Sequence, residues 1–265
     1  MNISKAANSN GITSNQIKLL AIIAMTIDHC AWTFFPGFRT DWVIILHIIG
    51  RITAPIMIYF IAEGCYYTKN IKKYIFRLFI LAIFSHFAYK LLLTPGNLKN
   101  IDSGLPFYYN FIPFKTGIFD QTSVIWAYLL GVIALAVDAK KINISKGWLK
   151  QIIITICFFG AFIADWSTPA ALAIFYIGKN HGNFKRQMLW LMGLITTYVI
   201  VYMIFINTIY GIIQFFIFLA IPILNSYNGE RGKWKGMKWF FYIYYPLHLA
   251  ILGIIGKYIS RITLF

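Results

Sequence analysis

The chain has 265 residues, of which 59% are hydrophobic and only 12% are charged. Soluble domains carry about a quarter charged residues, so this composition excludes water as the main solvent and indicates an integral membrane protein. The formal net charge of +16 would suggest nucleic acid in a soluble protein. Here the cations lie between apolar runs, so we expect no nucleic-acid partner and assign them to cytoplasmic loops and anionic lipid headgroups.

Apolar stretches long enough to cross the roughly 30 Å hydrocarbon core recur along the whole chain. They predict an all-α transmembrane helix bundle of about nine spans, the sixth of them short, at residues 17–36, 42–63, 74–94, 121–137, 149–165, 168–178, 187–206, 208–224 and 238–256. Pro55 and Pro246 lie within spans and predict kinks. The sequence has no internal repeat, and residues 95–120 are its one long polar connection. We therefore expect a single domain over residues 1–265.

The positions of Lys and Arg test this map independently of hydropathy. They gather after the second, fourth, sixth and eighth spans, as Lys69, Lys72, Lys73 and Arg77; Lys140, Lys141, Lys146 and Lys150; Lys179, Lys185 and Arg186; and Arg231, Lys233, Lys235 and Lys238. The intervening connections carry little positive charge. Cytoplasmic loops are the basic ones, so the amino terminus is predicted inside and, for an odd number of spans, the carboxyl terminus outside.

Ionisable residues within predicted spans are informative because a charge at the bilayer centre costs a few kcal/mol or more. They are Asp28 and His29 in the first span, Arg51 and Glu63 in the second, His86 in the third and His248 in the ninth. At about 1.5 Å per residue, the three histidines and the arginine fall roughly 15 to 18 Å from the cytoplasmic edge. This shared depth, reached from four helices, predicts a polar cavity near the midplane.

The residue types in this cavity suit proton transfer with charge stabilisation. A histidine can act as general base on an amine or a hydroxyl, and an arginine can stabilise a developing oxyanion. A single buried histidine is more often structural than catalytic, and Arg51 could simply neutralise Asp28. Neighbours on a helix lie about 100° apart, so Asp28 can pair with Arg51 and leave His29 free to work.

Other chemistries lack their motifs in this sequence. It contains no Gly-x-Ser-x-Gly elbow, no Walker loop and no His-Glu-x-x-His, so serine hydrolase, ATPase and metalloprotease functions have no support. The three cysteines show no Cys-x-x-Cys spacing, so we expect neither a disulfide framework nor a metal site.

The loop after the second span is a candidate anion site. Lys69, Asn70, Lys72 and Lys73 lie there, and they could bind the phosphates of coenzyme A. The same residues are equally explained as topology determinants and lipid-headgroup contacts, and both interpretations stay open.

Several motifs together resemble the TraX family, whose founding member is the conjugal-transfer pilin acetylase. They are Lys18-Leu-Leu-Ala-Ile-Ile-Ala-Met-Thr-Ile-Asp28-His29, Gly50-Arg51-Ile-Thr-Ala-Pro55, Glu63-Gly64, Thr68-Lys-Asn70, Tyr74-Ile-Phe-Arg77-Leu78, Ala164-Asp165-Trp166-Ser167 and Lys238-Trp-Phe-Phe-Tyr-Ile-Tyr-Tyr245-Pro246-Leu-His248-Leu249. They follow the family's order over nearly the whole chain. One departure is Thr168-Pro169, where the family commonly has a glycine.

The resemblance implies a membrane-embedded N-acetyltransferase of a bacterial cytoplasmic (inner) membrane. Acetyl-CoA is then the donor substrate, and the acceptor is a peptide or protein amino terminus, such as that of a pilin, or another small acceptor. Asp28, His29, Arg51, Glu63 and His248 match the family's polar signature. We predict five catalytic residues: Asp28, His29, Arg51, His86 and His248. We predict that the donor is bound by Glu63, Lys69, Asn70, Lys72, Lys73 and Arg77.

Two other functions compete with acetyl transfer. A midplane cluster of Asp, Arg and His is also how transporters relay protons, so a proton-coupled carrier of a small solute is the main alternative, although carriers are often built from inverted repeats and none is visible. A scaffolding subunit is the third, and it predicts indifference to substitution of His29.

Overall fold

A computed structural model describes residues 11–35, 40–93, 121–205 and 208–262, so the predicted connection at 95–120 lies outside the described part. The described residues form helices joined by turns and loops, and their β-structure consists of two isolated bridges. Its helices are α1 (Ser14–Phe34), α2 (Asp41–Gly50), α3 (Thr53–Tyr67), α4 (Ile71–Leu93), α5 (Val124–Asp138), α6 (Gly147–Gly160), η3 (Ala161–Ile163), α7 (Ser167–Lys179), α8 (Phe184–Phe205), α9 (Thr208–Gln214), η4 (Phe215–Leu219), α10 (Ala220–Asn225) and α11 (Met237–Ile262).

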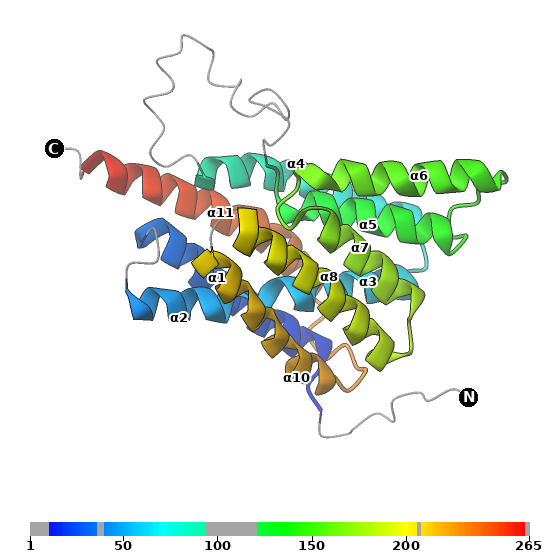
Figure 1. The fold of residues 1–265 in the computed structure, drawn as a ribbon, viewed down its shortest axis with the longest axis horizontal. Helices are drawn as coiled ribbons and strands as arrows, with labels where there is room; N and C mark the ends of the chain where they lie inside the picture. Colours follow the sequence, from blue (N-terminus) through cyan, green and yellow to red (C-terminus); the bar gives the residue numbers. More distant parts are fainter. Residues whose placement is uncertain (1–10, 36–39, 94–120, 206–207, 263–265) are drawn as a thin grey trace, which may run out of the picture.

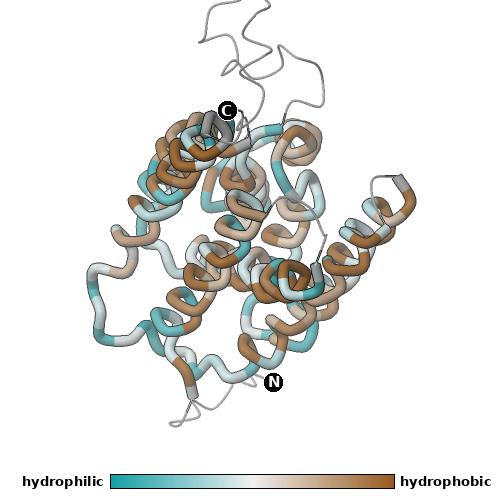
Figure 2. The backbone as a smooth tube through the Cα atoms, turned by 90° about the vertical axis from the view of Figure 1, so that its left-hand side faces the viewer, coloured by the Kyte–Doolittle hydropathy of each residue, from teal (hydrophilic) through white to brown (hydrophobic). Residues whose placement is uncertain are grey.

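The surface of the bundle is apolar in the way a bilayer requires. Within the described residues, six helical stretches are long and apolar enough to cross a membrane: Ser14–Phe34, Asp41–Tyr67, Ile71–Leu92, Phe184–Ile204, Thr208–Asn225 and Trp239–Ile259. Most helical turns are hydrophobic (Figure 2), and large side chains such as Phe159 (77% exposed) and Leu189 (68%) face outward. So much exposed apolar surface is foreign to a soluble monomer. The chain is a helical membrane protein. Each of the nine predicted ranges overlaps a helix, but only six described stretches have the length and hydropathy of a span, so nine crossings and the orientation of the amino terminus stay predictions.

The second predicted span differs from the expectation of a kink at Pro55. The chain breaks at Arg51 and Ile52, between α2 and α3, and Pro55 lies in the first turn of α3. The reason is steric, because a proline ring clashes with the carbonyl four residues earlier, which here belongs to Arg51. The break places the Arg51 side chain inside the bundle, where it is 5% exposed.

The helices around this break form the interior of the molecule. α11 packs along α4 and also contacts α1, while α5 packs on α7, α4, α6 and α3. In Figure 1, α4 and α11 lie along one edge and α6 lies at the periphery against α5. The α5–α7 contact is close because a Cβ at Gly131 would lie 2.9 Å from the Ala171 carbonyl oxygen. Small residues permit such close backbone approach between membrane helices.

The connection between α10 and α11 is held against the start of α1. The N–H of Ile12 donates to the Ser226 carbonyl at 2.8 Å, and the N–H of Ser14 donates to the Glu230 carbonyl at 2.9 Å. The side chain of Asn15 donates to the Trp234 carbonyl at 2.9 Å. These bonds bring a basic loop over the first turns of α1.

Candidate functional site

A cavity of about 570 Å³ opens in the middle of the bundle, and we call it the His29 cavity. Its wall combines residues from α1, the α2–α3 break, α3, α4, α5, α8, α9, α11 and the turn before α7. The polar part of that wall includes Asp28, His29, Arg51, Gln121, Asp165 and Tyr210. Three of the predicted catalytic residues therefore share one cavity.

His29 and His248 form a hydrogen-bonded pair. His29 Nδ1 lies 2.8 Å from His248 Nε2, and the rings are stacked with centroids 5.1 Å apart. His248 Nδ1 lies 3.0 Å from the Tyr244 carbonyl oxygen, which can only accept, so this nitrogen carries the hydrogen. With both rings neutral, His248 Nε2 accepts from His29 Nδ1–H. His29 Nε2 then keeps its lone pair, and it has no hydrogen-bond partner among the described residues.

Asp28 is held in a separate buried network beside this pair. One carboxylate oxygen is 2.7 Å from His47 Nδ1, and the other accepts from the Arg51 guanidinium in a short ion pair. Arg51 also donates from Nε to the His47 carbonyl at 3.1 Å and from Nη1 to the Tyr210 hydroxyl at 3.2 Å. Asp28 thus pairs with Arg51, the arrangement that leaves His29 free.

Gly50 makes this network possible. A Cβ at this position would collide with the side chain of Asp28. The absence of a side chain therefore lets the end of α2 approach α1 closely enough for Asp28 to reach both His47 and Arg51. His47 was not among the predicted site residues, because it follows the apolar run Val43–Leu46 as an isolated polar residue in the sequence.

His86 does not line the His29 cavity, although the sequence placed it at the same depth. Its Nδ1 lies 2.8 Å from the Thr122 hydroxyl. The backbone of Thr122 in turn accepts from the Asp165 N–H at 2.7 Å and donates to the Ile163 carbonyl at 2.9 Å. His86 thus supports the chain segment that carries Asp165 into the cavity wall. The depth argument could not distinguish this position from one on the cavity.

The turn from Asp165 to Ser167 has an unusual backbone. Trp166 and Ser167 have φ of 62° and 47°, and such left-handed conformations cost of order 1–3 kcal/mol each in non-glycine residues. The turn is fixed by the Trp166 N–H, which donates to Asp165 Oδ1 at 3.0 Å, and by the Ser167 hydroxyl, which donates to the Phe162 carbonyl at 3.0 Å.

Aromatic rings extend from this turn across the cavity. Trp166 stacks on Tyr198 at 5.0 Å between centroids, Tyr198 lies 4.5 Å from Tyr202, and Tyr202 lies 5.3 Å from Tyr210. The Arg51 guanidinium is 5.7 Å from the Tyr210 ring centroid. The motif Ala164-Asp165-Trp166-Ser167 was visible in the sequence, but nothing there linked it to the tyrosines of α8 and α9.

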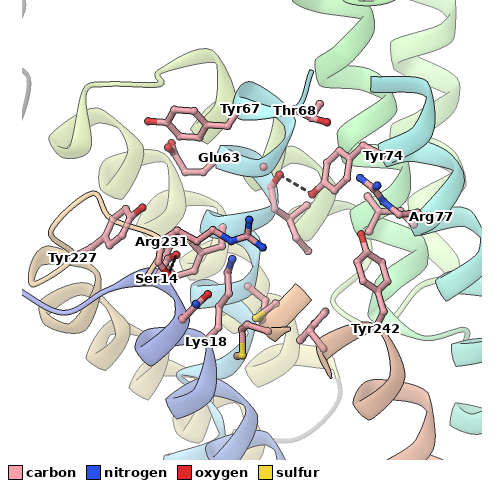
Figure 3. A pocket seen from close by; sticks show the side chains of 18 of the residues that line it. Ser14, Lys18, Glu63, Tyr67, Thr68, Tyr74, Arg77, Tyr227, Arg231 and Tyr242 are labelled. Atoms are coloured by element: carbon pink, nitrogen blue, oxygen red, sulfur yellow. Dashed lines mark hydrogen bonds between the residues drawn. The ribbon is translucent and has the colours of Figure 1, made fainter. Parts of the chain in front are cut away.

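A second cavity, of about 510 Å³, lies at the end of the bundle where α1 begins, and we call it the basic cavity. Figure 3 shows Lys18 and Arg231 reaching its centre together, with Arg77 on the other side beside Tyr74 and Tyr242. Lys18 Nζ lies 4.8 Å from the Phe60 ring centroid. Lys18 and Arg231 were not predicted as residues of a binding site, because only the pairing of the α10–α11 loop with α1 brings them together.

The basic cavity holds one carboxylate, which is already engaged. Glu63 Oε1 lies 3.0 Å from His181 Nδ1 and accepts from the Gln187 amide at 3.0 Å. The cations of the wall therefore outweigh its acids, and the cavity suits an anionic ligand.

The predicted donor-binding residues divide between the cavity and its surroundings. Glu63 and Arg77 line it. Lys69, Asn70, Lys72 and Lys73 do not, and they lie exposed at the start of α4, where Asn70 Oδ1 accepts from the Lys73 N–H at 2.9 Å as a helix cap. Their pattern as a basic loop could not show which side of the loop faces the bundle.

The two cavities are neighbours in the bundle. Met57, Ile125 and Phe241 line both of them, one residue each from α3, α5 and α11. Met57 and Ile125 are almost fully buried. An apolar constriction of three side chains thus separates the basic cavity from the wall that carries His29.

This architecture defines a class of helical membrane protein. Its members have a hydrogen-bonded histidine pair at a central cavity and a basic cavity next to it, at one end of the bundle. The chain belongs to the TraX family, because a family model described as TraX protein matches residues 13–256. It is similar to a probable fimbrial assembly protein FimC, serogroup H1, of Dichelobacter nodosus, with 26% identity over 244 residues, which cover 89% of this chain and 93% of that protein.

A second relative is an uncharacterized protein of Rickettsia prowazekii (strain Madrid E), 34% identical over 103 residues, or 39% of each chain. No solved structure matches the chain.

Proposed function

We propose that this protein is a membrane-embedded acetyltransferase that moves an acetyl group from acetyl-CoA to an amine or hydroxyl acceptor. The observation that carries the proposal is the His29–His248 pair, which leaves a basic ring nitrogen on a cavity that meets a cationic one. A general base beside an entry route for an anionic donor is what acyl transfer needs.

The donor fits the basic cavity by charge. Lys18, Arg77 and Arg231 supply cations for its phosphates, and the aromatic side chains of the wall offer faces for its base. Coenzyme A is a cytoplasmic donor, so this end of the bundle and the amino terminus are assigned to the cytoplasmic side of a bacterial inner membrane. The thin thioester arm then passes Met57, Ile125 and Phe241 to reach His29.

The reaction proceeds by addition and elimination at the thioester carbon. The acceptor N–H or O–H gives its proton to His29 Nε2 while the acceptor atom bonds to the carbonyl carbon. Arg51 has five N–H donors, three of which are engaged within the described residues, and it can donate to the oxyanion. Collapse breaks the carbon–sulfur bond, and the coenzyme A thiolate takes the proton from the His29 imidazolium. The products are acetylated acceptor and free coenzyme A.

A peptide or protein amino terminus is the favoured acceptor. The resemblance to a probable fimbrial assembly protein supports an acceptor of the pilin kind, since that relative covers nearly the whole chain.

The test is acetyl transfer from labelled acetyl-CoA by the purified protein, with His29→Ala and His248→Ala as variants. Loss of a general base reduces turnover by about 10²- to 10⁴-fold, so His29→Ala should lose transfer to that extent and still bind coenzyme A. Turnover retained in both variants would remove the proposed roles of the pair.

A proton-coupled carrier is the second candidate, and the meeting of two cavities inside the bundle favours it. Carriers place their sites near the bilayer midplane between such openings. Reconstituted protein that moves protons with a solute across vesicles, and transfers no label from acetyl-CoA, would select this candidate.

A further inference from the structure

The two carboxylates of the His29 cavity differ in how their charges are met. Asp28 is neutralised by Arg51 and bonded to His47. Asp165 accepts one hydrogen bond, from the Trp166 N–H, and the described residues provide it with no ion-pair partner. A carboxylate in a cavity wall without a partner cation is costly unless a ligand supplies the charge.

Several backbone and side-chain interactions hold Asp165 in place. Two successive residues after it adopt left-handed backbone conformations, and its own N–H is tied to Thr122, which His86 holds in turn. Strain of this kind persists where the surrounding structure over-determines it, and it concentrates at ligand sites.

Aromatic rings flank this carboxylate on the same wall. Trp166, Tyr202 and Tyr210 line the cavity, and Tyr198 links the first two by ring contacts. The face of an aromatic ring attracts a cation within about 6 Å of its centre. The rest of the wall is largely apolar, with Met25, Leu92 and Val124 among its members.

From this juxtaposition we infer that Asp165 and the rings of Trp166, Tyr202 and Tyr210 form a binding site for a primary ammonium group carried on an apolar residue. A carboxylate beside aromatic faces recognises a cation, whereas an anion would be repelled. A hydroxyl could donate to Asp165 but would leave its charge unmatched. The site thus selects an amine acceptor over a hydroxyl acceptor.

The ammonium site itself does not depend on the proposed transfer reaction. The inference rests on the proposed function only where it identifies the bound amine as the acceptor. The bound ammonium releases one proton to water to become the nucleophile, and the second goes to His29 as the amide forms. Asp165 is then a binding residue that positions the amine, and His29 remains the base.

The test is calorimetric titration of the purified full chain in detergent with benzylamine as probe and benzyl alcohol as its neutral counterpart, without any donor. Asp165→Asn removes the charge and keeps the shape. Asp138→Asn is the matched control, because Asp138 pairs with Lys150 at 2.9 Å at the end of α5 and lines neither cavity. Hydrogen bonds to charged groups are worth about 1.5–3 kcal/mol, so Asp165→Asn should bind benzylamine about 10- to 100-fold more weakly.

The expected pattern has three parts: benzylamine affinity equal in the wild type and Asp138→Asn, benzylamine affinity about 10- to 100-fold lower in Asp165→Asn, and benzyl alcohol affinity unchanged throughout. Equal benzylamine affinity in wild type and Asp165→Asn would overturn the inference, as would an equal loss for the alcohol.

If Asp165→Asn does not fold, Tyr202→Leu decides, since it lies outside the strained turn. Loss of a ring face should weaken benzylamine by about two- to tenfold and leave the alcohol unaffected, and an unchanged amine affinity counts against the site. The titration contains no donor, so it is independent of the transfer assay. Selective amine binding together with no acetyl transfer would reject the proposed function and leave the ammonium site standing. Transfer that survives without selective amine binding would reject the ammonium site alone.

Discussion

The basic cavity and the His29 cavity differ in how the charges of their described wall residues are balanced. In the basic cavity, Lys18, Arg77 and Arg231 face a space whose one carboxylate, Glu63, is occupied by His181 and Gln187. In the His29 cavity, the strong charges of Asp28 and Arg51 cancel within the protein. The first wall is built to attract an anion from solution.

The second wall is built to keep its own groups in place. Among the described residues, pairing Asp28 with Arg51 and His29 with His248 leaves one imidazole nitrogen, on His29, and one carboxylate, Asp165, available in the cavity. In the proposed reaction, the basic cavity supplies the affinity for the donor and the His29 cavity supplies the general base, with Met57, Ile125 and Phe241 between them.

Closing the constriction should separate the two cavities and have the largest effect. Ile125→Trp adds a bulky ring between the two cavities, so acetyl transfer should fall to background, whereas coenzyme A, held mainly by the cations of the basic cavity, should lose much less affinity. Radiolabel transfer and equilibrium binding measure the two quantities. A tryptophan at Ile156, a position on the outer face of α6 that is 62% exposed, is the matched control and should affect neither. Normal transfer by Ile125→Trp would show that the donor reaches His29 by another route.

Breaking the buried ion pair should destabilise the fold. Arg51→Met leaves Asp28 buried and charged without its main partner, which costs about 3–5 kcal/mol. The partly exposed counterpart, Lys150→Met, removes one of the two lysine partners of Asp138 and should cost less than about 1 kcal/mol. Denaturant unfolding in detergent compares them. Similar costs for the two variants would mean that Arg51 contributes no more than a surface charge.

Removing the hydrogen-bond partner of His29, the proposed general base, tests how its imidazole is oriented. His248→Leu should lower turnover about 10- to 100-fold, as expected for a group that fixes a ring tautomer. His248→Gln should restore part of the loss, because its side-chain oxygen can accept from His29 Nδ1. Steady-state turnover of the two variants measures the difference. Equal turnover by His248→Leu and His248→Gln would argue that the hydrogen bond between His29 and residue 248 has no role.

The smallest effect distinguishes the basic cavity from the basic loop beside it. Lys18→Met should raise the KM for acetyl-CoA about three- to tenfold with kcat unchanged, since one partly screened charge contact is lost. Lys72→Met, on the exposed start of α4 outside the cavity, should leave KM as it is. The opposite ranking would return the donor site to the Lys69–Lys73 loop.

These comparisons show what sequence reasoning could and could not reach. Depth along a helix is set by residue spacing, so His29, Arg51 and Asp28 were found as neighbours of one cavity. Depth alone gives no rotation about the helix axis, so His86, which faces Thr122, was grouped with them. The pattern of basic residues likewise singled out Arg77, which lines the basic cavity.

Contacts between distant segments were beyond reach for a physical reason. Lys18 meets Arg231 because backbone hydrogen bonds join residues 12–15 to residues 226–231, and no local pattern encodes that pairing. The break at Arg51 was visible as Pro55, but its position four residues earlier follows from the geometry of the ring clash.

Coenzyme A bound to the purified protein, observed by electron cryomicroscopy, is the measurement that tests the central claim most directly. The account predicts density for the phosphates among Lys18, Arg77 and Arg231, with the thiol arm passing Phe241 and ending beside His29. Phosphate density on the exposed residues Lys69 to Lys73, with no arm between Met57 and Ile125, would contradict it.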